Sequence, residues 1–151
     1  MTENSRRSKA VGTTRVRVRY AETDQMRVVY HANYLVWFEI GRVELMRQFG
    51  LDYSRMEAEE GIGIAVAEAR VRYKAPARYD DELTIETELA NLRGPVLQFR
   101  YRVLRESDQM LLCEGETIHV VVGRDMKRRP LPERYAKVLM GAAAEPIPER
   151  A

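Results

Sequence analysis

The hydrophobic and polar residues of the chain first alternate and then cluster. Residues 13–20 alternate strictly, with Val16, Val18 and Tyr20 on one side and arginines on the other. Because side chains of a strand point alternately to its two faces, this period of two predicts a strand with one buried face. The alternation stops at residues 21–29, which are predicted to be a loop.

The strongest helical pattern covers residues 31–49. Tyr34, Phe38 and Leu45 share one helical face, because they are separated by four and by seven residues. Apolar residues also fill much of the remaining circumference, so this helix is predicted to be buried on several sides. Gly50 is a natural stop signal, and a short, exposed helix is predicted over residues 53–60.

Strand patterns follow the second helix. Four strands are predicted within residues 62–74, 83–89, 97–103 and 110–123, and a terminal helix within residues 132–140. Short turns join the strands, which implies antiparallel pairing. One long helix against one antiparallel sheet is a compact α+β architecture. The uncovered face and edges of such a sheet predict self-association of the chain.

The composition is that of an ordinary globular protein. With 151 residues, 45% of them hydrophobic, the chain is predicted to form one domain over residues 13–140. Residues 1–12 carry three basic side chains and are expected to be a flexible tail. Residues 141–151 are expected to form a loose C-terminal tail.

Charge and cysteine content argue against several classes of protein. The 25 basic and 23 acidic residues give a net charge of +2, which argues against a dedicated nucleic-acid binder. The one cysteine, Cys113, excludes a disulfide within the chain and a cysteine-based zinc site, and it fits the reducing cytoplasm. No signal-peptide pattern and no run of about 18 apolar residues is present. A cytoplasmic protein without integral membrane association is therefore predicted.

The densest group of unusual residues, residues 20–34, lies where the first strand leads into the long helix. Asp24 in that loop would face the helix start, whose unpaired N–H groups and partial positive charge suit an oxyanion. Such a carboxylate could attack an acyl carbonyl or activate a water. From the local sequence alone, Asp24 is equally plausible as a turn or N-cap residue. With no Ser or Cys placed beside His31, a nucleophile–histidine triad is unsupported.

One block of sequence resembles a known family. The segment TDQMRVVYHANY (residues 23–34), followed by WFE (37–39) and Arg42, is similar to the signature of the 4-hydroxybenzoyl-CoA thioesterase/YbgC-like family. The similarity extends from about residue 14 to residue 132. The resemblance implies a hotdog fold, in which a curled antiparallel sheet wraps around one long central helix. It also implies homodimers or homotetramers and the hydrolysis of acyl-CoA or related thioesters.

The resemblance also implies roles for individual residues. The aspartate that matches Asp24 is catalytic in this family, and the backbone N–H that matches His31 polarises the thioester carbonyl. The side chain of His31 and its neighbours Tyr30 and Asn33 are candidates for contacts with the acyl-CoA substrate. CoA would enter as part of the substrate, and neither a metal nor a redox cofactor is implied.

Arg27 departs from the family pattern, which usually has glycine there. A glycine would allow a positive φ and a close approach of substrate to the loop. We expect Arg27 to keep an ordinary negative φ, to point outward, and to hold its guanidinium near the mouth of the pocket.

Other charged residues have two interpretations each. Glu39 and Arg42 are three residues apart on the predicted helix and could form an ion pair, although Glu39 is also a reserve candidate for the catalytic acid. The run of Lys127, Arg128 and Arg129 is either a solvated charge run or an attractor of the CoA phosphates.

Three other functions compete with a thioesterase. The first is a non-catalytic acyl-CoA-binding or sensing protein of the same fold, an idea that Arg27 keeps open. The second is a hotdog dehydratase or hydratase, which would need a histidine base and a carboxylate on a differently built helix. The third and weakest is an RNA- or membrane-binding protein that uses the basic residues 1–12.

Overall fold

The computed structural model describes residues 10–141, so nearly all of the two predicted tails lies outside the described part of the chain. The elements follow one another as β1 (Val11–Arg17), α1 (Asn33–Gln48), α2 (Tyr53–Glu60), β2 (Ile62–Tyr73), β3 (Glu82–Arg93), β4 (Val96–Arg105), β5 (Leu111–Gly123) and α3 (Glu133–Leu139). A 3-10 turn, Tyr20–Glu22, follows β1. The predicted order of one strand, one long helix and then four strands is confirmed.

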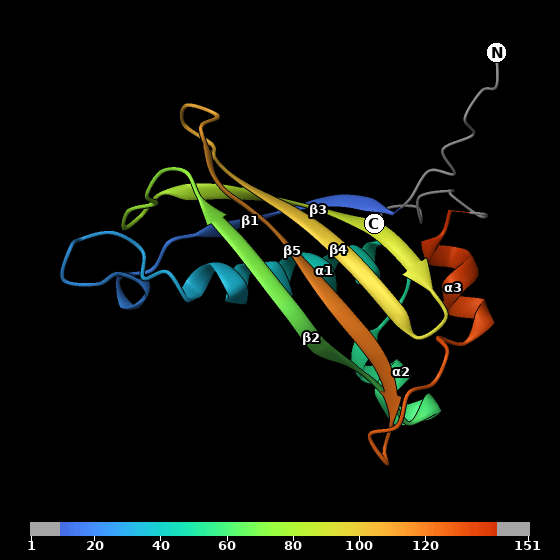
Figure 1. Cartoon of the computed structure of the whole chain (residues 1–151). Helices are drawn as coiled ribbons and strands as arrows, with labels where there is room; N and C mark the ends of the chain where they lie inside the picture. The colour runs from blue at the N-terminus through green and yellow to red at the C-terminus, as the bar shows by residue number, and fades with distance from the viewer. Residues whose placement is uncertain (1–9, 142–151) are drawn as a thin grey trace.

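The five strands form one antiparallel sheet in the order β1-β3-β4-β5-β2. α1 lies against one face of this sheet, behind the strands as drawn in Figure 1. β1 and β2 are the two edges, and the outer edge of β2 has no strand beside it within residues 10–141. The predicted α+β architecture, one antiparallel sheet against one long helix, is confirmed.

The alternation along β4 gives the sheet two chemically different faces. Tyr101 is buried toward α1, whereas Arg100 and Arg102 are exposed on the other face. Both arginines pair with glutamates of β3, Arg102 with Glu86 at 3.1 Å and Arg100 with Glu88 at 3.8 Å. The outer face is therefore covered by exposed ion pairs, and the core lies between the inner face and α1.

α1 approaches the sheet closely at two points. At Gly41, an added Cβ would lie 2.4 Å from Oγ1 of Thr87, so a larger residue would push the helix away from β3. Phe38 stacks on Tyr101 with ring centroids 4.2 Å apart and fills the space above Gly115. These contacts fix the height and rotation of α1, and so they fix where its N-terminus lies.

α1 is buried on one side only when the chain is taken alone. Trp37 and Leu45 are almost fully buried, but Leu35 keeps 40% and Val36 keeps 46% of its surface exposed. The prediction of a helix buried on several sides is wrong for the single chain, because the sheet covers one side of α1. No helix within residues 10–141 has the length and apolar character that a membrane span requires.

The predicted start of the chain differs most from the structure. β1 begins at Val11 and ends at Arg17, instead of spanning residues 13–20. Tyr20, predicted to face inward with Val16 and Val18, is 78% exposed. The reason is the 3-10 turn, which bends the chain after β1 and buries Glu22 in place of Tyr20.

Candidate active site

The loop that carries Asp24 is a small hairpin. Thr23 and Val29 form an isolated antiparallel bridge, and the N–H of Asp24 donates to the carbonyl of Val28 at 2.9 Å. Oδ1 of Asp24 accepts the N–H of Met26 at 2.8 Å, which is the turn role expected of an aspartate. Its second oxygen accepts no hydrogen bond from residues 10–141, so one side of this half-buried carboxylate remains available for chemistry.

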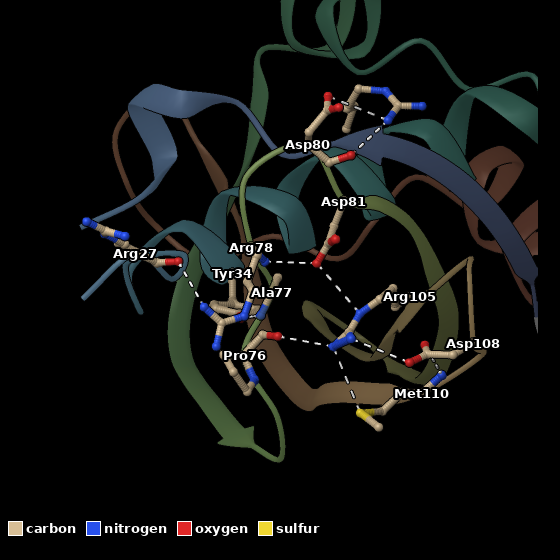
Figure 2. A network of polar contacts seen from close by, with 11 residues as sticks. Arg27, Tyr34, Pro76, Ala77, Arg78, Asp80, Asp81, Arg105, Asp108 and Met110 are labelled. Carbon is tan, nitrogen blue, oxygen red and sulfur yellow. Dashed lines mark hydrogen bonds and ion pairs between the residues drawn. The ribbon is translucent and has the colours of Figure 1, made fainter. Parts of the chain in front are cut away.

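Arg27 does not have the negative φ that the sequence predicted. Its φ is 64°, in the left-handed region that favours glycine. The cause is the hairpin itself: the N–H of Arg27 donates to the carbonyl of Asp24 at 2.9 Å, and the next residue must return the chain to the bridge at Val29. A left-handed residue after a tight turn is the common way to close such a hairpin. The exposed guanidinium of Arg27 points away from the neighbouring residues in Figure 2.

Glu22 is a buried carboxylate that the sequence analysis missed. It is 6% exposed, and its Oε1 accepts the N–H of Arg19 at 2.8 Å. Its Oε2 accepts the indole N–H of Trp37 at 3.0 Å. The carbonyl of Glu22 accepts two more donors, the N–H of Tyr30 at 2.9 Å and the side-chain amide of Asn33 at 2.8 Å. The one local signal is its spacing of three from Arg19, because Glu22 accepts the backbone N–H of the residue that precedes the 3-10 turn.

The start of α1 offers unpaired donors. The helix begins at Asn33, and its N-cap residue, Ala32, has no side chain that could cap it. Within residues 10–141, no acceptor is bonded to the N–H of His31 or of Ala32. Open amides at the start of a 16-residue helix carry a partial positive charge, so this end can stabilise a developing oxyanion.

Aromatic rings surround the helix start. The ring of Tyr30 lies 4.4 Å from that of His31, and the hydroxyl of Tyr73 donates to the carbonyl of His31 at 2.8 Å. Tyr30 and Tyr73 keep about half of their surface exposed, as an open wall of a binding site would. The side chain of Asn33, by contrast, is engaged with Glu22, so it holds the loop in this structure and is not turned to the surface.

The connection between β2 and β3 contacts the Asp24 hairpin, and Figure 2 shows one of these contacts, between Arg78 and the carbonyl of Arg27. The carbonyl of Ala77 accepts the N–H of Val29 at 2.8 Å, and the N–H of Ala77 donates to the hydroxyl of Tyr34 at 3.2 Å. Arg105 of β4 in turn holds this connection, because it donates to the carbonyl of Pro76 at 3.3 Å and lies 3.6 Å from Asp81. The Asp24 hairpin is thus supported by residues far away in the sequence.

A second polar cluster lies between α1 and the sheet. Thr117 joins the hydroxyl of Tyr101, at 2.6 Å, to Nε2 of His119, at 2.7 Å. Burial, together with the positive charge of Arg42 nearby, lowers the pKa of His119 to about 4. Arg42 turns to this cluster and does not form the expected ion pair with Glu39, which is exposed and has no ion pair within residues 10–141. No group of three or more His, Cys, Asp or Glu in this part of the chain could hold a metal.

Arg128 and Arg129 lie far from Asp24 within one chain. They follow β5, whose beginning pairs with Tyr73 next to His31 and whose end pairs with Ile62. Ten residues of strand, at about 3.3 Å each, separate these ends by roughly 30 Å. Figure 1 shows the Asp24 loop, in blue, and the segment after β5, in orange, at opposite ends of the molecule. Arg128 and Arg129 are exposed, and Arg129 lies 3.5 Å from Asp125.

Known proteins are similar to this chain in sequence. The model of the thioesterase-like superfamily matches residues 18–149. The acyl-CoA thioester hydrolase YbgC of Escherichia coli is 40% identical over 119 residues, which cover 78% of this chain and 87% of YbgC. The putative acyl-CoA thioesterase YneP of Bacillus subtilis is 34% identical over 115 residues, or 76% and 82% of the two chains.

A solved structure supports the same assignment. The 4-hydroxybenzoyl-CoA thioesterase of Pseudomonas sp. strain CBS-3 superposes with a TM-score of 0.79 at 26% identity, covering 85% of this chain and 99% of that one. The resemblance that the block at residues 23–34 indicated is therefore confirmed, and with it the hotdog fold. The chain belongs to the thioesterase-like superfamily.

Proposed function

We propose that this enzyme hydrolyses acyl-CoA thioesters to a free acid and CoA, with Asp24 as its catalytic carboxylate. The observation that carries the proposal is the pairing of two groups on one short segment: a carboxylate with an unoccupied oxygen, and the open amides at the start of α1. The superfamily and the names of the relatives, acyl-CoA thioester hydrolase among them, support the reaction class.

The two groups divide the chemistry between them. The N–H of His31 donates to the carbonyl oxygen of the thioester and stabilises the negative charge that develops there. Asp24 either takes a proton from a water that attacks the carbonyl carbon, or attacks that carbon itself to form an anhydride that water then hydrolyses. In both routes the C–S bond breaks, the sulfur leaves as the thiolate of CoA and takes up a proton, and Asp24 is regenerated. CoA is part of the substrate.

Substrate contacts are assigned to the residues around the carbonyl. Tyr30 and the imidazole of His31 line the exposed aromatic wall beside the open amides. Asn33 acts through the loop that it holds, and Arg27 adds a cation at the rim of the hairpin. Glu39 is an exposed residue of α1 and remains the reserve acid.

The basic segment after β5 joins the proposal only through a second copy of the chain. β2 is a 12-residue edge strand with many exposed residues, and such an edge is a template for pairing with another strand. Antiparallel pairing of two β2 edges about a twofold axis would bring Ile62 of one copy toward Tyr73 of the other. Arg128 and Arg129, about 30 Å from Asp24 in one chain, would then lie near the site of the other copy and could attract CoA phosphates. We therefore include a homodimer, or a homotetramer built from it, in the proposal.

Thiol release from short, long and aromatic acyl-CoAs tests the reaction. Release of free CoA from at least one class, with the matching acid, is the expected result. Tight binding without thiol release would support the sensing protein, and consumption of an enoyl-CoA without thiol release would support the hydratase. Light scattering tests the assembly, because a fully active species of 17.5 kDa would contradict the proposed self-association.

A further inference from the structure

We propose that Glu22 is a positioning residue of this site, which fixes the Asp24 hairpin relative to the open start of α1. The inference rests on the thioesterase function proposed above, because it concerns the same site. Glu22 itself is too deeply buried to touch a substrate, with 6% of its surface exposed. It acts through four donors that belong to three separate segments of the chain.

The carboxylate joins the end of β1 to the body of α1. Oε1 accepts the backbone N–H of Arg19 at 2.8 Å, and Oε2 accepts the indole N–H of Trp37 at 3.0 Å. The guanidinium of Arg19 lies 3.4 Å from the same carboxylate, but its side chain is 75% exposed and therefore screened by water. A buried carboxylate satisfied mainly by neutral donors is costly to desolvate, so hydrophobic gain does not account for its presence.

The carbonyl of Glu22 joins the end of the hairpin to the first turn of α1. It accepts the N–H of Tyr30 at 2.9 Å and the side-chain amide of Asn33 at 2.8 Å. Asn33 and Trp37 are four residues apart, so both contacts lie on the same side of the helix. Glu22 thus holds α1 at its first residue and again one turn further along.

These contacts leave the two reacting groups little freedom relative to each other. Only Thr23 separates Glu22 from Asp24, and its N–H and hydroxyl both donate to the carbonyl of Tyr20, at 3.1 and 2.7 Å. His31 lies between Tyr30 and Asn33, which are both bonded to Glu22. The carboxylate of Asp24 and the amide of His31 are therefore placed from one common anchor.

The substitution Glu22→Gln tests this role with minimal change in shape. A glutamine has an NH2 group in place of one carboxylate oxygen, so either the N–H of Arg19 or the indole N–H of Trp37 would face a donor instead of an acceptor. We expect kcat to fall between about tenfold and 10²-fold, the range for small misplacements of reacting groups, with KM within about twofold. Trp37 is the one tryptophan of the chain, so a single indole N–H resonance in an NMR spectrum reports its bond to Glu22. That resonance and the backbone amide of His31 should both move.

Glu59→Gln is the matched control. Glu59 also accepts from an arginine, Arg55 at 2.7 Å, but on the exposed α2. The substitution Glu59→Gln should leave kcat, KM and both resonances unchanged. If Glu22→Gln folds poorly, Glu22→Asp keeps the charge but withdraws it by one methylene, and its kcat should lie between the wild-type and glutamine values.

Three results would overturn the proposal. The first is a folded Glu22→Gln enzyme with wild-type kcat although the indole resonance has moved. The second is a loss of activity that follows the unfolded fraction alone, so that the folded molecules turn over normally. The third is an unmoved His31 amide in Glu22→Gln. Absence of hydrolysis by the wild-type chain would refute the thioesterase function instead, and the NMR comparison would still decide whether Glu22 positions the start of α1.

Discussion

The two ends of this molecule are built on different principles, although the sequence offers candidate functional residues at both. At the Asp24 end, a buried carboxylate, a tight hairpin and the helix start are joined by directed hydrogen bonds between 2.8 and 3.0 Å. At the end after β5, the charged side chains of Arg128 and Arg129 are exposed to water. A hollow of about 570 Å³ at that end is lined by Gly61, Gly123, Arg124 and neighbouring residues.

The two kinds of contact determine what each end can contribute. Directed bonds to buried groups hold atoms in place. An isosteric substitution at the Asp24 end should therefore lower kcat strongly, and the ionic strength should have little influence on that loss. Exposed charges attract an anionic ligand without fixing its geometry, so the basic end should tolerate single changes and respond to ionic strength. Under the proposed function, we therefore expect the chemistry at the first end and only a contribution to binding from the second.

The largest expected effect is that of Asp24→Asn. The amide oxygen can still accept the N–H of Met26, so the hairpin should persist, while the carboxylate proposed as base or nucleophile is lost. We expect kcat to fall by about 10²- to 10⁴-fold, the range for the loss of a general base. Steady-state thiol release measures this loss, and circular dichroism checks the fold.

Asp52→Asn is the matched control for that change. Asp52 is also an aspartate whose oxygen accepts a backbone N–H, that of Arg55, but at the start of α2. It should keep full activity. An Asp24→Asn variant that turns over as fast as the wild type would contradict the assignment, and Glu39 would be the next residue to test.

The second prediction concerns β5, the strand that joins the two ends. His119 on this strand has a pKa of about 4, below the usual 6.5, because burial and the charge of Arg42 disfavour its protonated form. The unfolded chain binds this proton below pH 6.5 and the folded chain does not. The contribution of His119 to the free energy of unfolding is therefore fully present above pH 6.5. It is lost as the pH drops toward 4, by up to roughly 3 kcal/mol. Urea unfolding of the wild type and of His119→Gln between these pH values measures the difference.

The glutamine variant should be less stable at neutral pH but lose less stability on acidification. Equal losses in the two proteins would show that carboxylates elsewhere, and not this buried imidazole, cause the acid sensitivity. That outcome would also show that the burial of His119 on β5 does not control how stability changes with pH.

The fold was predictable where its signals are local. The bounds of α2 agree with the prediction because Asp52 caps its start and Gly61 ends it with φ 64°. The strands β3 and β4 follow from alternation, since one face of each is buried. The early end of β1 could not be predicted, because the alternation continues as far as Tyr20 and only the burial of Glu22 reveals the bend.

The site was predictable in part for the same reason. Asp24 and His31 stand in a block whose residue types resemble a family. Glu22 could not be recognised, because its main partner, Trp37, is fifteen residues away and meets it only after α1 has packed. The left-handed φ of Arg27 was mispredicted because residue preference favours the other region, and the closing of the hairpin overrides it. The distance from Arg128 to Asp24 could not be predicted either, because it depends on how all the strands of the sheet pair.

The third prediction is the double change Arg128→Ala and Arg129→Ala at the basic end. Two exposed cations should together contribute on the order of 1 kcal/mol to the binding of a polyanion, so KM should rise by up to about tenfold at low salt. The rise should fade at high ionic strength, and kcat should stay unchanged. A thioester of pantetheine, which lacks the nucleotide phosphates, should show no rise at all.

Arg100→Ala is the control for the basic end, because Arg100 is equally exposed but lies on the outer face of the sheet and pairs with Glu88. If the double change instead lowers kcat and leaves KM alone at every salt concentration, the comparison between a chemical end and a binding end is wrong.

The smallest effect is expected from Arg27→Gly, at the rim of the Asp24 hairpin. Glycine removes the strain of a φ of 64° but also removes a cation. Relief of the strain should raise the free energy of unfolding by at most about 1 kcal/mol, and the melting temperature by roughly 2–4 °C. Loss of the cation should raise KM by less than about tenfold at low salt.

Two further variants separate these causes. Arg27→Lys keeps both the charge and the strain, so stability and KM should match the wild type. Arg27→Asn keeps no charge but tolerates the left-handed region, so it should share the higher KM of the glycine variant and part of its stability. If glycine and asparagine both raise kcat at an unchanged KM, Arg27 acts by restraining the hairpin. The Asp24 end would then be tuned by backbone geometry even at its exposed rim, and its contrast with the charge-built end after β5 would become sharper still.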